Sequence, residues 1–306
     1  MKRLLAVAAV ALGCALPAMA VAAITVVDDG GHAVTLPRPP TRIVTLAPSL
    51  TELVFAAGAG AAIVGTTALS DFPDAAKRIA RVGDASRLDV ERVLALKPDL
   101  VLVWQRGNLG REIAQIEAAG VPLFRLEPRR LDEVPHAIER LGALLGHDDD
   151  AKRDAAALRD ALARLRKAHE HAAPVRVFYQ VWQSPLLTIN GKHLIADVIA
   201  LCGGVNVFAE VGPLVPAVSM EAVVAADPEA IVTANEEGGR APAWQRAMLQ
   251  PSLAAWRRHP QLTAVRRGWL FALNGDLISR QGPRIVLGAE AMCAALDEVR
   301  RERAGR

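Results

Sequence analysis

The sequence predicts an α/β fold of two lobes joined by one long helix. Three observations carry this prediction. Apolar strand-like runs alternate with helical runs in both halves of the chain, one fifteen-residue phrase occurs twice, and an alanine- and arginine-rich segment with helical periodicity separates the halves. The 306 residues are about twice the length of a typical domain, so each lobe can bury a core of its own.

The first 22 residues are expected to be a secretory signal peptide. Two cations open the chain, an apolar run follows over residues 4–12, and Pro17 breaks it just before the small-residue triplet 18–20. The run is too short to span a bilayer and ends at an A-x-A cleavage site, so we expect a soluble exported protein. Lipid attachment at Cys14 is the alternative, which is disfavoured because the residue three positions earlier is alanine instead of leucine.

The N-terminal lobe is expected over residues 23–147 as strands that alternate with helices. In chain order we expect a strand at RIVTLAP (42–48), a helix at PSLTELVFAAG (48–58), a strand at AAIVGTT (61–67), a helix and then the strand LVLVW (100–104), a helix at NLGREIAQIEAAG (108–120) and a strand at VPLFRLEP (121–128). Continuous Val/Ile/Leu strands between helices are typical of a parallel sheet that is covered on both faces.

One interdomain helix is expected over residues 148–172. Its apolar residues recur at spacings of 4, 3, 4 and 3 on one helical face: Ala151, Ala155, Leu158, Leu162 and Leu165. Such a helix would reach about 36 Å, and three aspartates at its start suit the positive end of its dipole. His169 and His171 at its far end are expected to be solvated, too distant from His147 to share a metal ion with it.

The C-terminal lobe is expected over residues 173–306. It is expected to begin with the strand VRVFYQVW (175–182) and to continue with a helix near 193–202, a second copy of the repeated phrase, the strand WLFALNGD (269–276) and a helix from about Pro283. Two cysteines, Cys202 and Cys293, remain in this lobe once the leader is removed. In an exported chain such a pair often forms a disulfide, and two buried free thiols are the alternative.

The repeated phrase links the two lobes. DVERVLALKPDLVLV (89–103) and SMEAVVAADPEAIVT (219–233) match at positions always 130 apart: Glu91/Glu221, Val93/Val223, Ala95/Ala225 and Pro98/Pro228. Each copy opens with a helix-capping residue and continues as an apolar helix, a proline turn and a strand. The lobes are therefore expected to be Rossmann-like structural duplicates, each with a parallel sheet.

The chain lacks the signatures of common catalytic and nucleotide-binding sites. It has no G-x-x-x-x-G-K-[ST], G-x-S-x-G or H-E-x-x-H motif, and the run Gly58-Ala59-Gly60 follows a helix, the wrong side for a phosphate loop. Removing the leader lowers the formal net charge from +3 to +1, which does not indicate nucleic-acid binding. An exported two-lobed chain of this kind is more typical of a receptor whose ligand binds between the lobes.

From Arg42 to its C-terminal helix the chain resembles the periplasmic substrate-binding proteins of ABC importers that have a rigid interdomain helix. That group serves cobalamin, haem and ferric siderophores, and the likeness is closest to its cobalamin-binding members. The segments that carry it are RIVTLAPSLTELVFAAG, SDFPDAAKRI, LDVERVLALKPDLVLVWQRGN, ALCGGVNVF, VPAVSMEAVVAADPEAIV and SRQGPRIVLGAEAMC.

The resemblance implies partners and a disulfide. The family's paired cysteines fall on Cys202 and Cys293, and its two importer-docking glutamates fall on Glu91 and Glu221. It implies a periplasmic monomer, with no cofactor and no metal of its own, that meets a permease dimer and its ATPases. A glutamate in a first helical turn also needs no partner, since the helix dipole stabilises it by about 0.3–1 kcal/mol.

The resemblance also implies a ligand set. Trp104 matches an aromatic position of the cobalamin-binding members, and Trp182 is expected to contribute from the other lobe. Other aromatic positions of those members are Leu69, Ala85, Val215 and Leu277 here, and the loop from Asp276 to Arg280 is expected at the cleft. Burial of the two tryptophans against helices is the alternative interpretation.

Three other functions remain open. A ferric siderophore comes second to cobalamin, with Arg106, Arg240 and Arg280 facing a charged chelate. Haem comes third, because Asp84 stands where the haem binders carry an axial tyrosine and the sole tyrosine, Tyr179, lies inside a strand. The function of another class is an exported enzyme that uses Asp276 and a neighbouring histidine, which no spacing of a nucleophile and a base supports.

Overall fold

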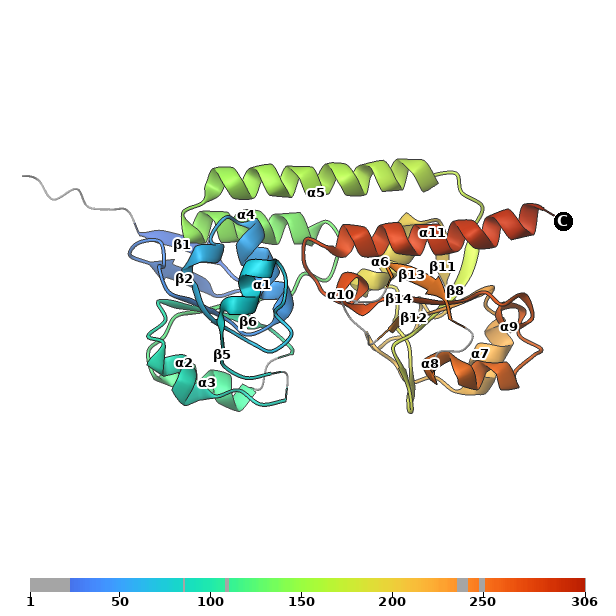
Figure 1. Ribbon diagram of the computed structural model, residues 1–306, viewed down its shortest axis with the longest axis horizontal. Helices are drawn as coiled ribbons and strands as arrows, with labels where there is room; N and C mark the ends of the chain where they lie inside the picture. The colour runs from blue at the N-terminus through green and yellow to red at the C-terminus, as the bar shows by residue number, and fades with distance from the viewer. Residues whose placement is uncertain (1–22, 85, 108–109, 236–241, 248–250, 306) are drawn as a thin grey trace, which may run out of the picture.

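The computed structural model describes residues 23–84, 86–107, 110–235, 242–247 and 251–305. In these residues the chain forms two α/β lobes that lie side by side beneath one long helix (Figure 1), which confirms the predicted fold class. Within the same residues, no helix is both long enough and apolar enough to cross a membrane. The expected signal peptide with Cys14, and the candidates Ala85 and Arg240, lie outside the described residues.

The N-terminal lobe is built on a five-stranded parallel sheet of order β5-β4-β3-β6-β7. Two apolar clusters pack on its two faces, as a sheet between helices requires. Its elements are β1 (Ile24–Val27), β2 (Ala33–Leu36), β3 (Ile43–Thr45), α1 (Pro48–Ala56), η1 (Gly60–Ala62), β4 (Ile63–Thr66), η2 (Asp74–Arg78), β5 (Ala80–Arg81), α2 (Val90–Ala95), β6 (Leu100–Trp104), α3 (Gly110–Ala118), β7 (Leu123–Leu126) and α4 (Glu133–Leu145).

The C-terminal lobe is built on a sheet of order β11-β8-β12-β14-β13, parallel except for the antiparallel edge strand β13. Its elements are β8 (Val175–Gln180), β9 (Trp182–Gln183), β10 (Leu186–Leu187), α6 (Leu194–Leu201), β11 (Gly204–Asn206), α7 (Met220–Ala226), β12 (Ala230–Asn235), β13 (Trp244–Arg246), α8 (Pro251–Ala254), η4 (Ala255–Arg258), α9 (Thr263–Arg267), β14 (Leu270–Asn274), α10 (Gly275–Ile278) and α11 (Ile285–Ala304). The strand expected over 175–182 ends at Gln180, and Trp182 begins the short hairpin β9–β10.

The helix between the lobes is α5 (Asp148–His169), 22 residues that span about 33 Å. Its buried face consists of Ala151, Ala155, Leu158 and Leu162, four of the five positions that share the helical spacing. This face packs on α1 and α4 of the N-terminal lobe and on α6 and α11 of the C-terminal lobe. The helix therefore holds both lobes along one apolar stripe.

The two copies of the repeated phrase form the same unit, one in each lobe. Asp89 caps α2 by accepting the N–H of Arg92 at 2.9 Å, and the Ser219 hydroxyl caps α7 by accepting the N–H of Ala222 at 3.1 Å. The strands β6 and β12 follow after the proline turns. This result confirms the predicted helix, turn and strand of each copy.

The duplication extends to the turns that connect these helices to their strands. Lys97 and Asp227, which are 130 positions apart, both have left-handed backbone conformations with φ of 47° and 36°. In each lobe an arginine at the start of the first central strand, Arg42 or Arg176, donates to the carbonyl oxygen of the last helical turn. The lobes therefore share their turn geometry as well as their sequence pattern.

Candidate functional site

A hollow of about 630 Å³ opens on the C-terminal lobe, where the parallel strands β8, β12 and β14 end. The carboxyl edge of a parallel sheet is the usual place for a ligand, because helix N-termini and loop side chains converge there. The residues that line the hollow are Gln180, Val181, Trp182, Gln183, Thr233, Ala234, Asn235, Pro251, Ser252, Gly275 and Ser279.

Trp182 forms an exposed aromatic wall of this hollow. Its side chain belongs to a residue that is 55% exposed, and its Nε1 donates to the carbonyl oxygen of Ser184 at 3.0 Å within the β9–β10 hairpin. The neighbouring Val181 is also exposed. An indole whose polar edge is satisfied and whose apolar surface remains in water suits a flat ligand.

The floor of the hollow is rigid because Gln180 is buried in a hydrogen-bond network. Its Oε1 accepts the indole N–H of Trp256 at 2.7 Å, and its Nε2 donates to the carbonyl oxygen of Ser252 at 2.7 Å. Thr233 on the next strand donates to the backbone carbonyl of Gln180 at 3.0 Å. The ends of β8 and β12 are thus held together by the hydrogen bonds of Gln180 and Thr233.

Trp104 lies at the corresponding edge of the N-terminal lobe, at the carboxyl end of β6. It is half-buried and packs against the main apolar cluster. A Cβ added at Gly107 would lie only 1.8 Å from the Trp104 ring, so the backbone of the following turn covers part of the indole. The indole of Trp104 therefore packs against the core, and its edge lies near the carboxyl ends of the strands.

Leu69 and Val215 are exposed apolar residues on different lobes, at 75% and 39% exposure. Leu69 adopts a left-handed backbone conformation with φ of 64°, and the exposed Phe72 follows it in the same loop. Apolar side chains that stay in water at strand ends are informative, since a protein normally buries them unless they contact a partner or a ligand.

Arg280 and Asp276 engage each other and the Leu69 loop. Arg280 donates to the Asp276 carboxylate at 2.6 Å, to Asp71 at 3.0 Å and to the carbonyl oxygen of Leu69 at 3.1 Å. Burial by itself lowers the pKa of Arg280, but the carboxylates of Glu52 and Asp71 raise it more, so the guanidinium stays charged. The expected ligand loop is thus a charged bridge between the lobes.

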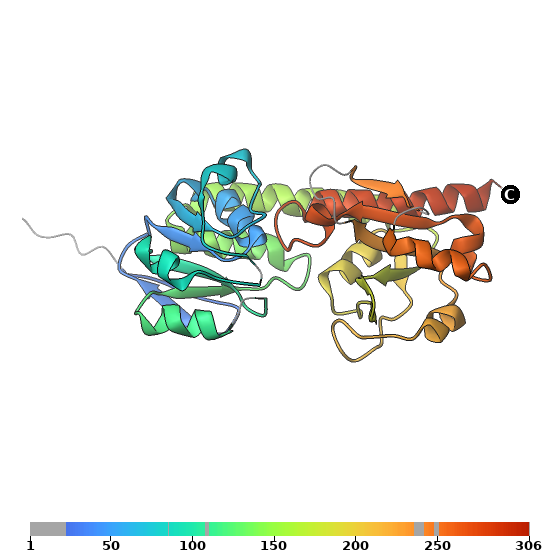
Figure 2. The ribbon, with the colours of Figure 1, turned by 60° about the horizontal axis from the view of Figure 1, so that its bottom comes forward.

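Glu52, at the centre of this bridge, was not singled out from the sequence. Its carboxylate is 1% exposed and accepts from Arg280 at 3.0 Å and from two nitrogens of Arg284 at 2.7 and 2.9 Å. The only local signal is an acidic residue in the apolar helix PSLTELVFAAG. The segment that carries both arginines extends from the C-terminal lobe toward the N-terminal lobe (Figure 2).

Glu91 and Glu221 lie away from the hollow, in the first turns of α2 and α7. Both are exposed, and the two helices lie on the side of the molecule opposite α5, one in each lobe (Figure 1). Hydrogen bonds from its own backbone N–H and from the Ser219 hydroxyl hold the pKa of Glu221 below its usual value. That side chain is therefore an ionised, accessible carboxylate at neutral pH.

A second hollow, of about 800 Å³, surrounds Glu91 on the N-terminal lobe. Charged residues of both signs dominate its lining, among them Arg81, Asp84, Arg87, Asp89, Arg92, Arg111 and Glu112. Such a surface suits a charged protein partner better than a large apolar ligand.

Tyr179 is buried in β8, as its place in a predicted strand indicated. It is 2% exposed, and this burial raises the pKa of its hydroxyl. A haem iron therefore has no access to this side chain. Among the described residues, no three His, Cys, Asp or Glu side chains come together in a way that could hold a metal ion.

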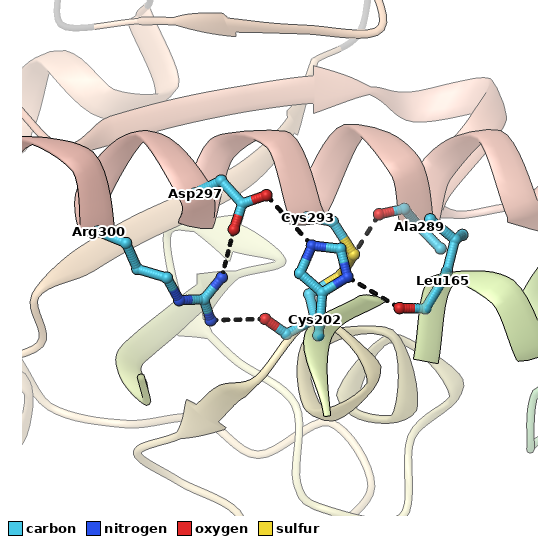
Figure 3. Close-up of a disulfide and its surroundings, with 7 residues drawn as sticks. Leu165, Cys202, Ala289, Cys293, Asp297 and Arg300 are labelled. Atoms are coloured by element: carbon cyan, nitrogen blue, oxygen red, sulfur yellow. Dashed lines mark hydrogen bonds and ion pairs between the residues drawn. A yellow bond between two sulfur atoms is a disulfide. The ribbon is translucent and has the colours of Figure 1, made fainter. Parts of the chain in front are cut away.

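Cys202 and Cys293 form a disulfide, which confirms the predicted pairing. Figure 3 shows this bond between the end of α6 and the middle of α11, with Asp297 and Arg300 beside it. Arg300 donates to the carbonyl oxygen of Cys202 at 2.6 Å and to Asp297 at 2.7 Å. Salt-bridged side chains thus fix the same helix junction that the disulfide closes.

The expectation that His169 is solvated is wrong. Its side chain is 11% exposed, its Nδ1 lies 2.8 Å from the carbonyl oxygen of Leu165, and its Nε2 lies 3.2 Å from Asp297. The reason is that α11 packs alongside the end of α5, which the spacing within α5 does not reveal. Both ring nitrogens therefore lie within hydrogen-bond distance of an oxygen atom, one on α5 and one on α11.

Comparisons with known proteins agree with this geometry. Residues 43–277 match the family model described as periplasmic binding protein. A vitamin B12-binding protein of Yersinia pestis (strain Pestoides F) is 34% identical over 258 residues, which cover 84% of this chain and 87% of the relative.

Solved structures give the same result. The periplasmic vitamin B12-binding protein BtuF of Vibrio cholerae is 32% identical with a TM-score of 0.74, over 86% of this chain and 98% of the other. The periplasmic heme-binding protein RhuT from Roseiflexus sp. RS-1 is 26% identical with a TM-score of 0.72, over 84% and 98% of the two chains.

Proposed function

The chain belongs to the periplasmic binding protein family, and on that premise we propose that it captures cobalamin or a related corrinoid and delivers it to an ABC importer. The observation that carries the proposal is the 34% identity with a vitamin B12-binding protein over most of both chains. The ligand is cargo in this proposal, bound between the lobes and released unchanged, and not a cofactor.

The hollow on the C-terminal lobe supports a large, flat and mostly apolar ligand. Its volume of about 630 Å³ lies within the usual range of small-molecule sites. Trp182 and Val215 on this lobe and Leu69 on the other leave apolar surface in water, which a corrin ring would bury. In the proposal Trp104 contributes the edge of its indole from the N-terminal lobe.

Two alternatives receive less support. Haem is the second candidate because a heme-binding protein is 26% identical to this chain, but the sole tyrosine is buried and cannot reach an iron. An enzyme that uses Asp276 is disfavoured because Arg280 already holds that carboxylate at 2.6 Å. A ferric siderophore would need free cations at the hollow, and Arg280 is occupied by carboxylates.

The exposed Glu91 and Glu221 support an importer as the protein partner. In the proposal the mature protein works as a monomer in the periplasm after its signal peptide is removed, and each glutamate meets a basic residue on one half of the permease dimer. A partner with two-fold symmetry needs one carboxylate from each lobe, and the repeated phrase supplies both.

Titration of the purified mature protein with cyanocobalamin tests the proposal. Calorimetry should give one site per chain, and cobinamide should compete, whereas hemin and a ferric hydroxamate should not. The absorption spectrum of protein isolated from periplasm provides an independent check, because corrin, Soret and ferric-chelate bands differ. Tight binding of hemin with no binding of either corrinoid would reject the proposal.

A further inference from the structure

The bridge between the lobes begins at a buried carboxylate. Glu52 lies on α1 of the N-terminal lobe, is 1% exposed in its side chain, and accepts hydrogen bonds from Arg280 and Arg284 of the C-terminal lobe. A buried carboxylate is unfavourable unless cations and hydrogen bonds compensate for the lost water. The buried Glu52 carboxylate of the N-terminal lobe therefore depends on the two arginines of the C-terminal lobe.

The same two arginines hold the loop that carries Leu69 and Phe72. Arg280 donates to the carbonyl oxygen of Leu69 at 3.1 Å, and the guanidinium of Arg284 lies 4.2 Å from the centre of the Phe72 ring. Asp71, between these two residues, accepts from Arg280 at 3.0 Å. Three groups of the loop, on Leu69, Asp71 and Phe72, are thus contacted from the opposite lobe.

The loop is also anchored from its own lobe. The Ser70 hydroxyl is buried and lies 2.8 Å from Thr66 Oγ1, and the carbonyl oxygen of Ser70 accepts from Arg81 at 2.9 Å. Leu69 itself has φ of 64°, a conformation that a leucine adopts only when its surroundings impose it. Contacts from both lobes therefore fix the loop at and directly after Leu69, while its side chain stays exposed.

The bridge touches the ligand hollow at its other end. Arg280 follows directly after Ser279, which lines the hollow together with Gly275. Arg280 also holds Asp276 in the first turn of α10. One guanidinium therefore connects the floor of the hollow in the C-terminal lobe to the exposed apolar loop of the N-terminal lobe.

We propose that Glu52 is a positioning residue for ligand capture, which acts through Arg280 and Arg284 to hold the Leu69–Phe72 loop at one fixed distance from the C-terminal lobe before the ligand arrives. The inference rests on the proposed function and deepens it. A site whose halves are already in place avoids the ordering cost of assembling them on binding, so its affinity is higher. Glu52 does not contact the ligand.

Glu52→Gln tests this role, because it keeps the shape of the side chain and removes the charge. The ligand-free variant should scatter X-rays with a broader distribution of lobe separations than the wild type. Its dissociation constant for cyanocobalamin should rise by tenfold or more. Saturating ligand should restore the wild-type scattering profile, since the ligand itself then joins the lobes.

Glu139→Gln is the matched control. Arg159 holds Glu139 through two hydrogen bonds of 2.6 Å, but this pair joins α4 to α5 and does not touch the loop. The control should lose stability without changing scattering or affinity. Wild-type affinity in Glu52→Gln, or an equal loss of affinity in both variants, would overturn the proposal.

Two milder variants decide the question if Glu52→Gln does not fold. Arg284→Lys keeps the charge but loses the two-pronged contact, and Asp71→Ala removes a partner that is 44% exposed. Each should weaken cyanocobalamin binding by about three- to tenfold at 1.4 kcal/mol per decade, and unchanged binding in both would refute the positioning role. If the wild type binds no corrinoid, the proposed function is refuted whatever the role of Glu52. Identical X-ray scattering of the ligand-free wild type and variants would refute the positioning role independently of the ligand.

Discussion

Cys202, the residue that ends α6, is joined by a disulfide to Cys293 in the middle of α11, and 91 positions of sequence separate the two. Both cysteines are buried. The closed loop contains β11, β12 and β14 and therefore most of the C-terminal sheet. A single covalent bond thus restricts the unfolded chain over the larger part of this lobe.

Replacing both cysteines by alanine should destabilise the protein strongly. In the chain-entropy model, removing a disulfide that closes a loop of this length lowers the free energy of unfolding by about 4–5 kcal/mol. Denaturant unfolding followed by circular dichroism measures the difference. Reductant should lower the denaturant midpoint of the wild type to about that of the double variant, and it should leave the midpoint of the double variant unchanged. Equal midpoints for oxidised wild type and double variant would contradict this prediction.

Trp182→Ala and Trp104→Ala should separate ligand contact from packing. Trp182 is 55% exposed, so its loss should leave the melting temperature nearly unchanged while it weakens corrinoid binding by tenfold or more. Trp104 packs on the core and beneath Gly107, so its loss should also lower stability by about 1–3 kcal/mol. Calorimetry and thermal melting of both variants give the two quantities. A Trp182→Ala variant with wild-type affinity would place the ligand elsewhere.

Stability should fall in mild acid because of His193. Its Nδ1 accepts the N–H of Ile195 at 3.1 Å at the start of α6, and burial lowers the pKa of this imidazole below its ordinary value of 6.5. The folded state therefore binds the proton less readily than the unfolded state. The contribution of His193 is present above pH 6.5 and is lost as the pH falls through the lower pKa of the folded protein.

Urea unfolding between pH 7.5 and pH 5 measures this effect. His193→Asn keeps a capping acceptor that does not titrate, so the variant should lose less stability than the wild type over that interval. His193→Ala should cost about 1 kcal/mol at pH 7.5 through loss of the cap. Parallel pH profiles of wild type and His193→Asn would show that another group causes the acid sensitivity.

The elements that the sequence predicted well are those with strong local periodicity. The strand β6 has the predicted bounds of Leu100–Trp104, and α5 begins at the first of the predicted aspartates. The repeated phrase predicted two helix-turn-strand units because capping residues, apolar spacing and proline all act within a few positions. Local chemistry was therefore sufficient for these elements, whereas the order of the strands in each sheet was not predicted.

Features that depend on distant contacts could not be predicted in this way. Glu52 and Arg280 are 228 positions apart, and nothing in either neighbourhood indicates that they meet. The helix α4, which contains Pro135, was also not predicted from the sequence. That proline lies in the first helical turn, where its missing N–H has no partner to lose, so the helix forms around it. The Cys202–Cys293 disulfide was expected because two cysteines remain in an exported chain, and the resemblance strengthened that expectation; the spacing of the two cysteines did not indicate it.

The proposed docking role of Glu91 and Glu221 makes the sharpest prediction for transport. Both side chains are exposed in first helical turns, one in each lobe, on the side of the molecule away from α5 (Figure 1). Neither lines the hollow beside Trp182. Their chemistry should therefore matter only when the importer is present.

Reversing both glutamates to arginine should abolish uptake and preserve ligand binding. Attraction to a basic permease surface becomes like-charge repulsion, which costs several kcal/mol of association. Loss of two favourable contacts with helix dipoles should lower stability by at most about 1–2 kcal/mol.

Cyanocobalamin affinity of the purified variant and uptake into proteoliposomes that contain the cognate importer give the paired measurement. The control variant is Glu170→Arg, at the exposed C-cap residue of α5, which lies outside both docking positions and outside the charged hollow around Glu91, so it should transport normally. Normal uptake by the double variant would show that both glutamates only stabilise the starts of their helices. Failed uptake with intact ligand binding is the result that the position of the two carboxylates predicts.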